Sequence, residues 1–159
     1  MDKHTLIAKV IAQLNGELEL LAKAARAAHA EATDESSKAE NKYDTRGLEA
    51  SYLARGQSRQ AAEAAQAIED LQALPVREFA AGDEIEVSAL VELAGKRERN
   101  FYFIAPRAGG TEVTLDGEEI LVITPQSPLG QQLVGRKQGD KIKLTVAGNS
   151  NEFRVASVV

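Results

Sequence analysis

The sequence lacks cysteine and tryptophan altogether and has few other aromatic residues. Three Tyr and four Phe are the only aromatics among its 159 residues. The absence of cysteine excludes disulfide bonds, thiolate zinc sites and catalytic cysteines. No apolar run reaches the roughly 18 to 20 residues that a membrane span needs, and residues 1–4 do not open a cleavable signal sequence. We therefore expect a cytoplasmic protein that makes no contact with a membrane.

Basic residues are too few to give the chain a positive charge. Its 19 Lys and Arg are outnumbered by 24 Asp and Glu, so the net charge is −5, and the isoelectric point is about 5.2. Proteins that bind nucleic acid through bulk electrostatics normally carry a basic footprint. The overall charge therefore argues against direct binding of nucleic acid.

Proline is absent before Pro75, and this absence separates two halves of different composition. Residues 1–75 contain 18 Ala and 3 Gly, whereas residues 76–159 contain the other 9 Gly and most of the Val and Phe. Alanine favours helix, while glycine, proline and β-branched residues favour turns and strands. We expect a helical region over 1–75 and a globular domain over 76–159.

Apolar positions in the first half recur with spacings of four and three residues. The first series is Ile7, Ile11, Leu14, Leu18, Leu21, Ala25 and Ala28, and the second is Ala50, Ala54, Gln57, Ala61, Ala64, Ile68 and Leu71. Such spacing is typical of a coiled-coil seam. Two matched series predict an antiparallel helical hairpin that folds back near Ala39.

The second half has the signals of an α+β module with an antiparallel sheet. Asp116-Gly117 is a two-residue hairpin turn, and Ser127-Pro128 supplies an N-cap and an N1 proline for a short helix that Gly135 would end. A further turn is expected at 148–151. Strands are expected over 84–93, 99–104, 111–115, 119–124, 141–147 and 152–158, and the helix over 129–134.

More than half of the excess negative charge is concentrated near the predicted fold-back. The range 31–49 contains six acids and three bases, a net charge of −3, and the rest of 1–75 is neutral. Mg²⁺ prefers carboxylate oxygen and often accepts only one or two carboxylates. An acidic tip, near 33–46, could therefore complete a metal site on a partner. A solvated loop would have the same composition, so charge alone leaves both interpretations open.

A basic cluster is expected in the middle of the hairpin. The predicted register places Lys23 opposite Arg55, with Arg26 and Arg59 one turn away from them. These four side chains would suit a phosphate backbone or an acidic protein surface. Bases on an exposed helix also keep a protein soluble, and the sequence does not separate the two roles.

Three segments resemble a known family. The longest covers 123–142 and has Ser-Pro, then Leu-x-Gly, then Gly-Asp before an apolar strand; the others are Tyr-Leu-Ala-Arg-Gly-Gln at 52–57 and Ile-Glu at 68–69. In these segments and in its two-part layout the chain resembles the Gre family of bacterial transcript-cleavage factors, over nearly its whole length. The resemblance implies a coiled coil over 1–75 and an FKBP-like domain over 76–159.

The resemblance also implies a function and a partner. Gre factors dock at the rim of the secondary channel of RNA polymerase, and tip carboxylates on the coiled coil help to hold Mg²⁺ in the polymerase active site, which then cleaves backtracked RNA. We accordingly expect a monomeric accessory factor that is not an enzyme by itself and has no cofactor of its own. It would reach nascent RNA only through the polymerase, and Ser127 and Pro128 would lie at the partner interface.

The carboxylates of the family can be placed only in part. Counting back without a gap from 54–55 and 68–69 puts the family Asp on Asp44, which we take as the ligand of the shared Mg²⁺. The family Glu falls on Gly47, so Glu40 or Glu49 is the candidate for the second carboxylate. A non-cleaving regulator or inhibitor that occupies the same channel is therefore an alternative.

Two other classes of function fit the sequence less well. FKBP-like folds include prolyl isomerases, whose sites are aromatic pockets, and this half has no tryptophan to build one. A chaperone that holds clients at a coiled-coil tip would expose apolar surface there, whereas the range 31–49 is acidic and has a single aromatic residue.

Overall fold

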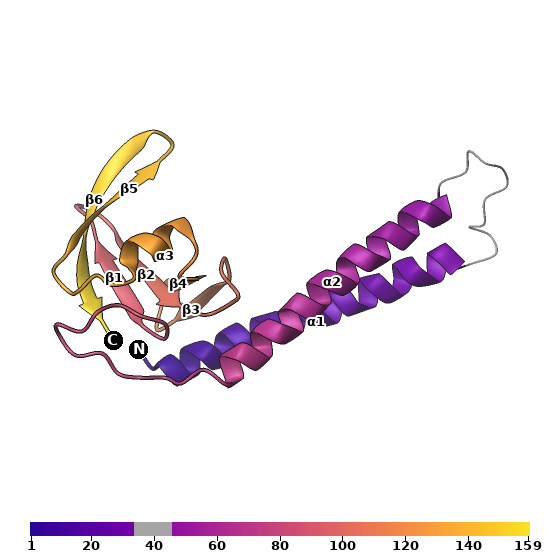
Figure 1. Ribbon diagram of the computed structural model, residues 1–159, viewed down its shortest axis with the longest axis horizontal. Helices are drawn as coiled ribbons and strands as arrows, with labels where there is room; N and C mark the ends of the chain where they lie inside the picture. The colour runs from indigo at the N-terminus through magenta and orange to yellow at the C-terminus, as the bar shows by residue number, and fades with distance from the viewer. Residues whose placement is uncertain (34–45) are drawn as a thin grey trace. The chain divides into compact units, whose positions relative to one another are not determined.

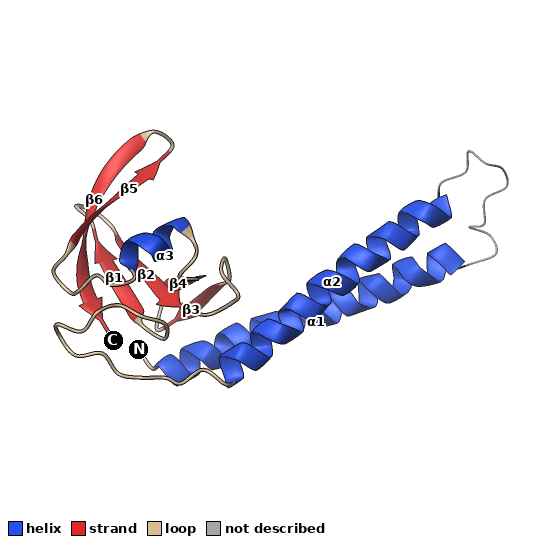
Figure 2. Cartoon of the chain, in the orientation of Figure 1, coloured by secondary structure: helices blue, strands red, loops and turns tan. Residues whose placement is uncertain are grey.

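The chain forms two long helices followed by a six-stranded sheet with one short helix (Figures 1 and 2). The computed structural model describes residues 1–33 and 46–159. Helix α1 spans Lys3–Thr33 and helix α2 spans Arg46–Gln72. The predicted fold class, a helical hairpin followed by an α+β domain, is confirmed. The predicted fold-back at Ala39 lies outside the described residues.

Side-chain caps and a proline set the outer ends of the two helices. Asp2 precedes α1, and its Oδ2 accepts hydrogen bonds from the Thr5 backbone N–H at 2.9 Å and the Thr5 hydroxyl at 2.5 Å. The hydrogen bond from the Thr5 side chain is the main cause that lowers the pKa of Asp2. The cap is therefore strongest above the ordinary pKa of a carboxyl group and weakens as the pH falls below it. Helix α2 stops just before Pro75, which cannot continue a helix.

Burial along the helices follows the predicted seam. Ile7, Leu14 and Ile68 are buried, and Leu18 and Leu21 are half-buried. The other buried seam positions are Ala64 and Leu71. The seam prediction missed Leu6 and Val10, which lie off the seam and are fully buried near the start of α1. A second face of this helix end is therefore covered as well.

Contacts divide the chain into two compact units that do not follow the helix boundaries. The sheet unit comprises Met1–Ile11 and Asp70–Val159, and the hairpin unit comprises Ala12–Glu69. The sequence places a boundary at 75/76, where regular helix has ended. The contacts instead assign the first turns of α1, with the buried Leu6 and Val10, and the last residues of α2 to the sheet unit.

The sheet has the strand order β3-β4-β2-β1-β6-β5. Its strands are β1 Leu90–Ala94, β2 Arg99–Ile104, β3 Glu112–Leu115, β4 Glu118–Ile123, β5 Lys141–Val146 and β6 Asn149–Val158. Four of the five neighbouring pairs are antiparallel, but β2 and β4 are parallel, with Phe101 opposite Ile120. The sheet is therefore mixed, and the wholly antiparallel sheet was a wrong expectation. After β2 the chain first forms the edge strand β3, so β4 returns beside β2 in the same direction.

Residues 84–89 do not belong to a strand, contrary to the expectation of a strand over 84–93. Ile85 alternates with exposed neighbours, but its backbone pairs only with the loop after α3, through bonds of 2.8 Å to Arg136 and 2.9 Å from Gly135. Ser88 has a positive φ of 78°, which breaks the extended conformation. The regular ladder therefore begins at Leu90.

Two hairpins of the sheet have two-residue turns with left-handed backbone. Asp116 and Gly117 have φ values of 54° and 84°, which confirms the predicted turn there. Ala147 and Gly148 have values of 51° and 81°. The second turn is tighter than the expected 148–151, and β6 consequently begins at Asn149. Alanine is an unusual residue for this conformation, so the sequence did not indicate a turn that begins at Ala147.

One face of the sheet is buried, and the other is buried only over part of the sheet. One face packs against α3, Pro128–Leu133, in a cluster that includes Leu93, Leu133 and Val155. On the other face Phe103 and Val122 are fully buried. Ion pairs from Met1 to Asp116 at 4.0 Å and from Asp70 to Arg107 at 2.5 Å tie the helix ends into the same unit.

Lys3 is buried among backbone and ring atoms of the segment that follows α2. It is 3% exposed, its ammonium group donates a hydrogen bond to the carbonyl of Arg77, and it lies 5.0 Å from the centroid of the Phe79 ring. The Arg77 guanidinium stacks on the same ring at 4.3 Å. Loss of water on burial lowers the pKa of Lys3. This cluster anchors the start of α1 to the segment that leaves the hairpin.

Candidate functional site

The segment with the clearest family resemblance begins with the capped helix α3. Ser127 precedes the helix in an extended conformation, its Oγ accepts a hydrogen bond from the Gly130 N–H at 3.0 Å, and its hydroxyl donates to the Thr124 carbonyl at 2.7 Å. Pro128 occupies the first turn, where its missing N–H costs nothing. The predicted N-cap and N1 proline are therefore confirmed.

The close approach of α3 to Thr124 requires glycine at position 130. A Cβ atom at this position would lie 1.9 Å from the carbonyl oxygen of Thr124, which is backbone and cannot swing away. Helix α3 can therefore approach the end of β4 this closely only with glycine at position 130. The helix ends at Leu133, and Gly135 follows the C-cap residue Val134 with a φ of 86°, as expected of a glycine that stops a helix.

The Gly-Asp part of the motif forms a second turn. Gly139 has a φ of 95° and donates its N–H to the Val155 carbonyl at 2.8 Å. Asp140 accepts a hydrogen bond from the Lys137 N–H on Oδ2 at 2.9 Å, and the Asp140 N–H donates back to the Lys137 carbonyl at 3.0 Å. These residues position β5 beside β6.

The matching residues of 127–140 are therefore used mainly to build the fold. The hydroxyl of Ser127, which the sequence assigns to a partner interface, already donates one hydrogen bond and accepts another. Pro128 is exposed and is the part of this pair that a partner could reach. Chemistry specific to this chain must come from other residues.

The acidic segment can be placed only at its edges. Asp44 and Glu40 lie outside the described residues, and the side chain of Glu49 does as well, although its backbone is the fourth residue of α2. Glu31 is exposed near the end of α1. Gly47, where the family Glu would fall, is the second residue of α2. The chain passes from α1 to α2 through this acidic range.

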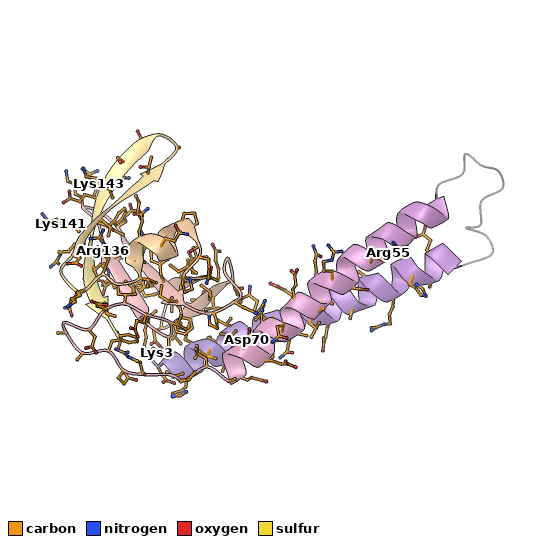
Figure 3. The ribbon with its side chains drawn as sticks, in the orientation of Figure 1. Lys3, Arg55, Asp70, Arg136, Lys141 and Lys143 are labelled. Atoms are coloured by element: carbon orange, nitrogen blue, oxygen red, sulfur yellow. The ribbon has the colours of Figure 1, made fainter. Side chains whose placement is uncertain are left out.

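The four bases assigned to the middle of the hairpin all lie on the hairpin unit. Lys23 and Arg26 are exposed on α1, and Arg55 and Arg59 are exposed on α2 (Figure 3, where Arg55 is labelled). A partner that contacts both helices can therefore reach all four.

The described residues contain no obvious site of another kind. Within 1–33 and 46–159 no group of three or more His, Asp or Glu side chains could hold a metal ion. No helix in the same residues is long and apolar enough to cross a membrane. Phe79, Phe103 and Phe153 are buried in packing, and the half-buried Phe101 and Tyr102 line a hollow of only about 190 Å³.

Sequence reasoning missed a group of bases in the sheet unit that carry no ion pair. Arg77, Arg99 and Arg107 each pair with a carboxylate. Lys143 and Arg154, by contrast, form no ion pair with the residues that the structure describes. A charge count over the whole of 76–159 hides this group. A comparison of two similar segments would have found it, since Gly-Asp-Glu-Ile-Glu at 82–86 reappears as Gly-Asp-Lys-Ile-Lys at 139–143.

No protein-family model matches the sequence, and neither does any curated protein. Several solved structures do. GreA factor homolog 1 (Gfh1) of Thermus thermophilus is 24% identical, over 96% of this chain and 94% of that chain, with a TM-score of 0.38. Gfh1 of Thermus aquaticus is 26% identical, over 95% and 92%, with a TM-score of 0.40. The transcription elongation factor GreA/GreB of Nitrosomonas europaea is 21% identical, over 74% and 94%, with a TM-score of 0.38.

Proposed function

We propose that this chain is a transcription elongation factor of the Gre type that binds RNA polymerase at its secondary channel. One observation carries the proposal: the pattern of 123–142, which resembles the Gre family, follows a hairpin of two long helices in the same chain. At about 1.5 Å per residue α1 is about 46 Å long. A hairpin of two such helices is long and only two helices wide, which suits entry into a channel.

The acidic range 31–49 is the part that would act on the polymerase active site. Asp44, with Glu40 or Glu49, would supply carboxylate oxygens to Mg²⁺ in that site and would orient the attacking water. The ion, when bound, lowers the pKa of bound water and neutralises charge on the phosphate. With the water so oriented, it would add to the phosphorus as the bond to the 3′ oxygen breaks. The factor itself would hold no cofactor and would act as a monomer.

The remaining predicted contacts would hold the factor in place. Lys23, Arg26, Arg55 and Arg59 would face acidic or phosphate groups along the channel, which agrees with their exposure on both helices. Pro128 would lie at the docking surface of the sheet unit, with Ser127 shaping the turn beneath it. Nascent RNA would be reached through the polymerase that already binds it.

One observation favours a second candidate, a secondary-channel regulator that does not stimulate cleavage. Gly47 stands where the family Glu is expected, and it lies in the first turn of α2. Glycine has no side chain to offer a ligand, so the pair of carboxylates is complete only if Glu40 or Glu49 replaces it. Without the second carboxylate the hairpin would occupy the channel and block other factors.

A backtracked elongation complex tests both candidates. RNA shortening is measured with polymerase alone, with the wild-type chain, and with Asp44→Asn. We expect the wild type to accelerate cleavage and Asp44→Asn to lose most of this effect, about a hundredfold, because the positioned carboxylate no longer orients water. Glu63→Gln is the matched control, since Glu63 is exposed on α2 away from the acidic range, and it should cleave like the wild type.

Binding to polymerase is measured in the same samples. Binding without any stimulation of cleavage would favour the second candidate, the non-cleaving regulator, over the cleavage factor. Absence of binding would refute both candidates. Unchanged cleavage in a Glu40→Gln, Glu49→Gln double variant would remove these two residues from the mechanism and leave Asp44 as the acting carboxylate.

A further inference from the structure

Charge in residues 76–159 is strongly polarised. We use the name basic end for residues 94–98 and 136–154. The basic end contains seven bases and three acids, a net charge of +4, whereas the rest of 76–159 contains three bases and nine acids, a net charge of −6. The small net charge of this half is therefore the sum of two large and opposite parts.

Strand register brings the bases of the basic end onto one surface. Lys141 is paired with Arg154, and Arg154 is paired with Ala94 at the end of β1. Directly paired residues point to the same face of a sheet. Ile142 and Phe153 are buried on the core side, so Lys141, Lys143 and Arg154 project from the opposite, solvent side. Figure 3 labels Lys141 and Lys143 on β5 and Arg136 in the segment between α3 and β5.

Further bases come from the loops on either side. Lys96 and Arg97 lie in the turn after Ala94 and line a groove of about 740 Å³ that also touches the start of β6. Arg136 and Lys137 precede β5, and both are exposed. The surface thus combines a two-stranded ribbon with bases from the loops beside it.

The acids in this region are already engaged or lie at its margin. Glu152 is 3.6 Å from Lys141, and Asp140 accepts the hydrogen bond from the Lys137 backbone. Glu98 lines the groove beside Lys96. Lys143 and Arg154 form no ion pair with any residue that the structure describes, although Glu152 lies opposite Lys143 in the strand register and pairs with Lys141 instead. Their charges are therefore available to a ligand.

We propose that the basic end binds the sugar–phosphate backbone of double-stranded DNA without reading its sequence. This inference goes beyond the proposed function, because it concerns a different surface and does not require polymerase. Positive side chains with hydroxyl and amide groups beside them, here Ser150 and Asn151, are the usual donors to phosphate oxygens. Duplex DNA presents one phosphate charge per about 1.7 Å of its helix axis.

The composition of the surface favours duplex DNA over two other polyanions. A protein partner needs an apolar core in its interface, and among the described side chains of β5 and β6 no large apolar residue is exposed. Single strands are bound through exposed aromatic rings on which bases stack. The only aromatic residue of the basic end is Phe153, which is buried.

The spacing of the bases sets the expected salt dependence. Lys141 and Lys143 are two residues apart on one strand, about 7 Å, and β6 places Arg154 about 5 Å from Lys141. Three phosphate contacts correspond to a slope of about −2.7 in a plot of log affinity against log salt, or about a 40-fold loss between about 50 and 200 mM salt. Binding should therefore be weak and easily lost at high salt.

The experiment measures binding of the full chain to a short fluorescent DNA duplex of mixed sequence, without polymerase. We expect Lys143→Gln with Arg154→Gln to weaken binding about tenfold at low salt and to reduce the slope by about two. The matched control is Lys9→Gln with Arg107→Gln, which removes the same charge from exposed positions elsewhere and should leave affinity and slope nearly unchanged. Because Arg107 loses its ion pair with Asp70, circular dichroism must show that this control is folded. Glu152→Gln should tighten binding, because it frees Lys141.

Three results would overturn the proposal. One is no binding by the wild type at low salt, and another is equal weakening by the two double variants, which would indicate general electrostatics. The third is stronger binding of the same surface to polyglutamate or to single-stranded DNA than to the duplex, which would assign it to an acidic protein or to unpaired strands. None of these results bears on cleavage of backtracked RNA, so the proposed function is tested separately.

Discussion

The two units of this protein differ in whether a glycine can be replaced by a larger residue. In the sheet unit, a Cβ atom on Gly130 would lie 1.9 Å from the Thr124 carbonyl oxygen. In the hairpin unit, a Cβ atom on Gly16 or Gly56 would meet nothing within 4 Å. The sheet unit therefore depends on a few backbone positions that admit one residue type. The hairpin depends on a repeated pattern that tolerates many residues.

The largest expected effect is that of Gly130→Ala. The added methyl group must displace either α3 or the end of β4, and we expect a loss of about 3 kcal/mol in the free energy of unfolding. Amide hydrogen exchange should show the loss across α3 and β4. The same substitution at Gly16 is the control. Equal stability of the two variants would contradict the contrast between the units.

The cap of α3 should be the next most sensitive feature. Ser127→Ala removes the acceptor of the Gly130 N–H and the donor to the Thr124 carbonyl, which should cost about 1 to 2 kcal/mol. Ser127→Thr keeps the hydroxyl group and should recover most of the loss. Thermal unfolding followed by circular dichroism measures both. If Ser127→Thr were as unstable as Ser127→Ala, the hydroxyl group would not be the cause of the stability.

A polar seam residue gives the hairpin a stabilising prediction. The Oε1 atom of Gln57 is buried without a hydrogen-bond partner among the described residues. Leucine at this position adds apolar contact and removes an unpaired acceptor, so Gln57→Leu should raise stability by about 1 kcal/mol. Hydrogen exchange of the hairpin unit measures the gain. Gln57→Glu is the control with the opposite expectation, since it would bury a charge. If Glu stabilised the hairpin, the side chain at this position would be in contact with water.

The smallest expected effects are those of Gly16→Ala and Gly56→Ala. Both positions are exposed and lie inside helices. Alanine has the higher helix propensity, so each change should raise the stability of the hairpin unit by about 0.5 to 1 kcal/mol. The two gains should add, because the residues lie on different helices. A lower melting temperature for either variant would mean that the helix needs glycine there.

The predictable part of the fold is the part with local signals. The heptad spacing, the cap at Ser127, the turn at Asp116-Gly117 and the helix end at Gly135 each depend on residues close together in sequence. The strand expected over 84–93 was too long because Ser88 reverses the backbone for a tertiary reason, its hydrogen bond to Ile104. The parallel pair of β2 and β4 depends on which edge the chain reaches first, and no local pattern records that choice.

The candidate sites divide in the same way. The sequence identified Asp44 and its neighbours by composition and by family resemblance, and their geometry lies outside the described residues. The basic end escaped notice because its bases are spread over 94–98 and 136–154 and meet only through strand register. Strand register is a long-range property, so a charge count along the chain does not reveal a surface that forms through strand pairing.

The assignment of Met1–Ile11 to the sheet unit has a consequence for how the protein is made. These residues are synthesised before the other residues described, yet the strands of the same unit begin at Leu90 and end at Val158. At about 5 to 20 residues per second, the start of α1 waits several seconds or more for that surface to be synthesised. During this interval the hairpin unit, which is contiguous in sequence, can already fold. Residues 1–11 can therefore join their unit only after the rest of that unit has been made.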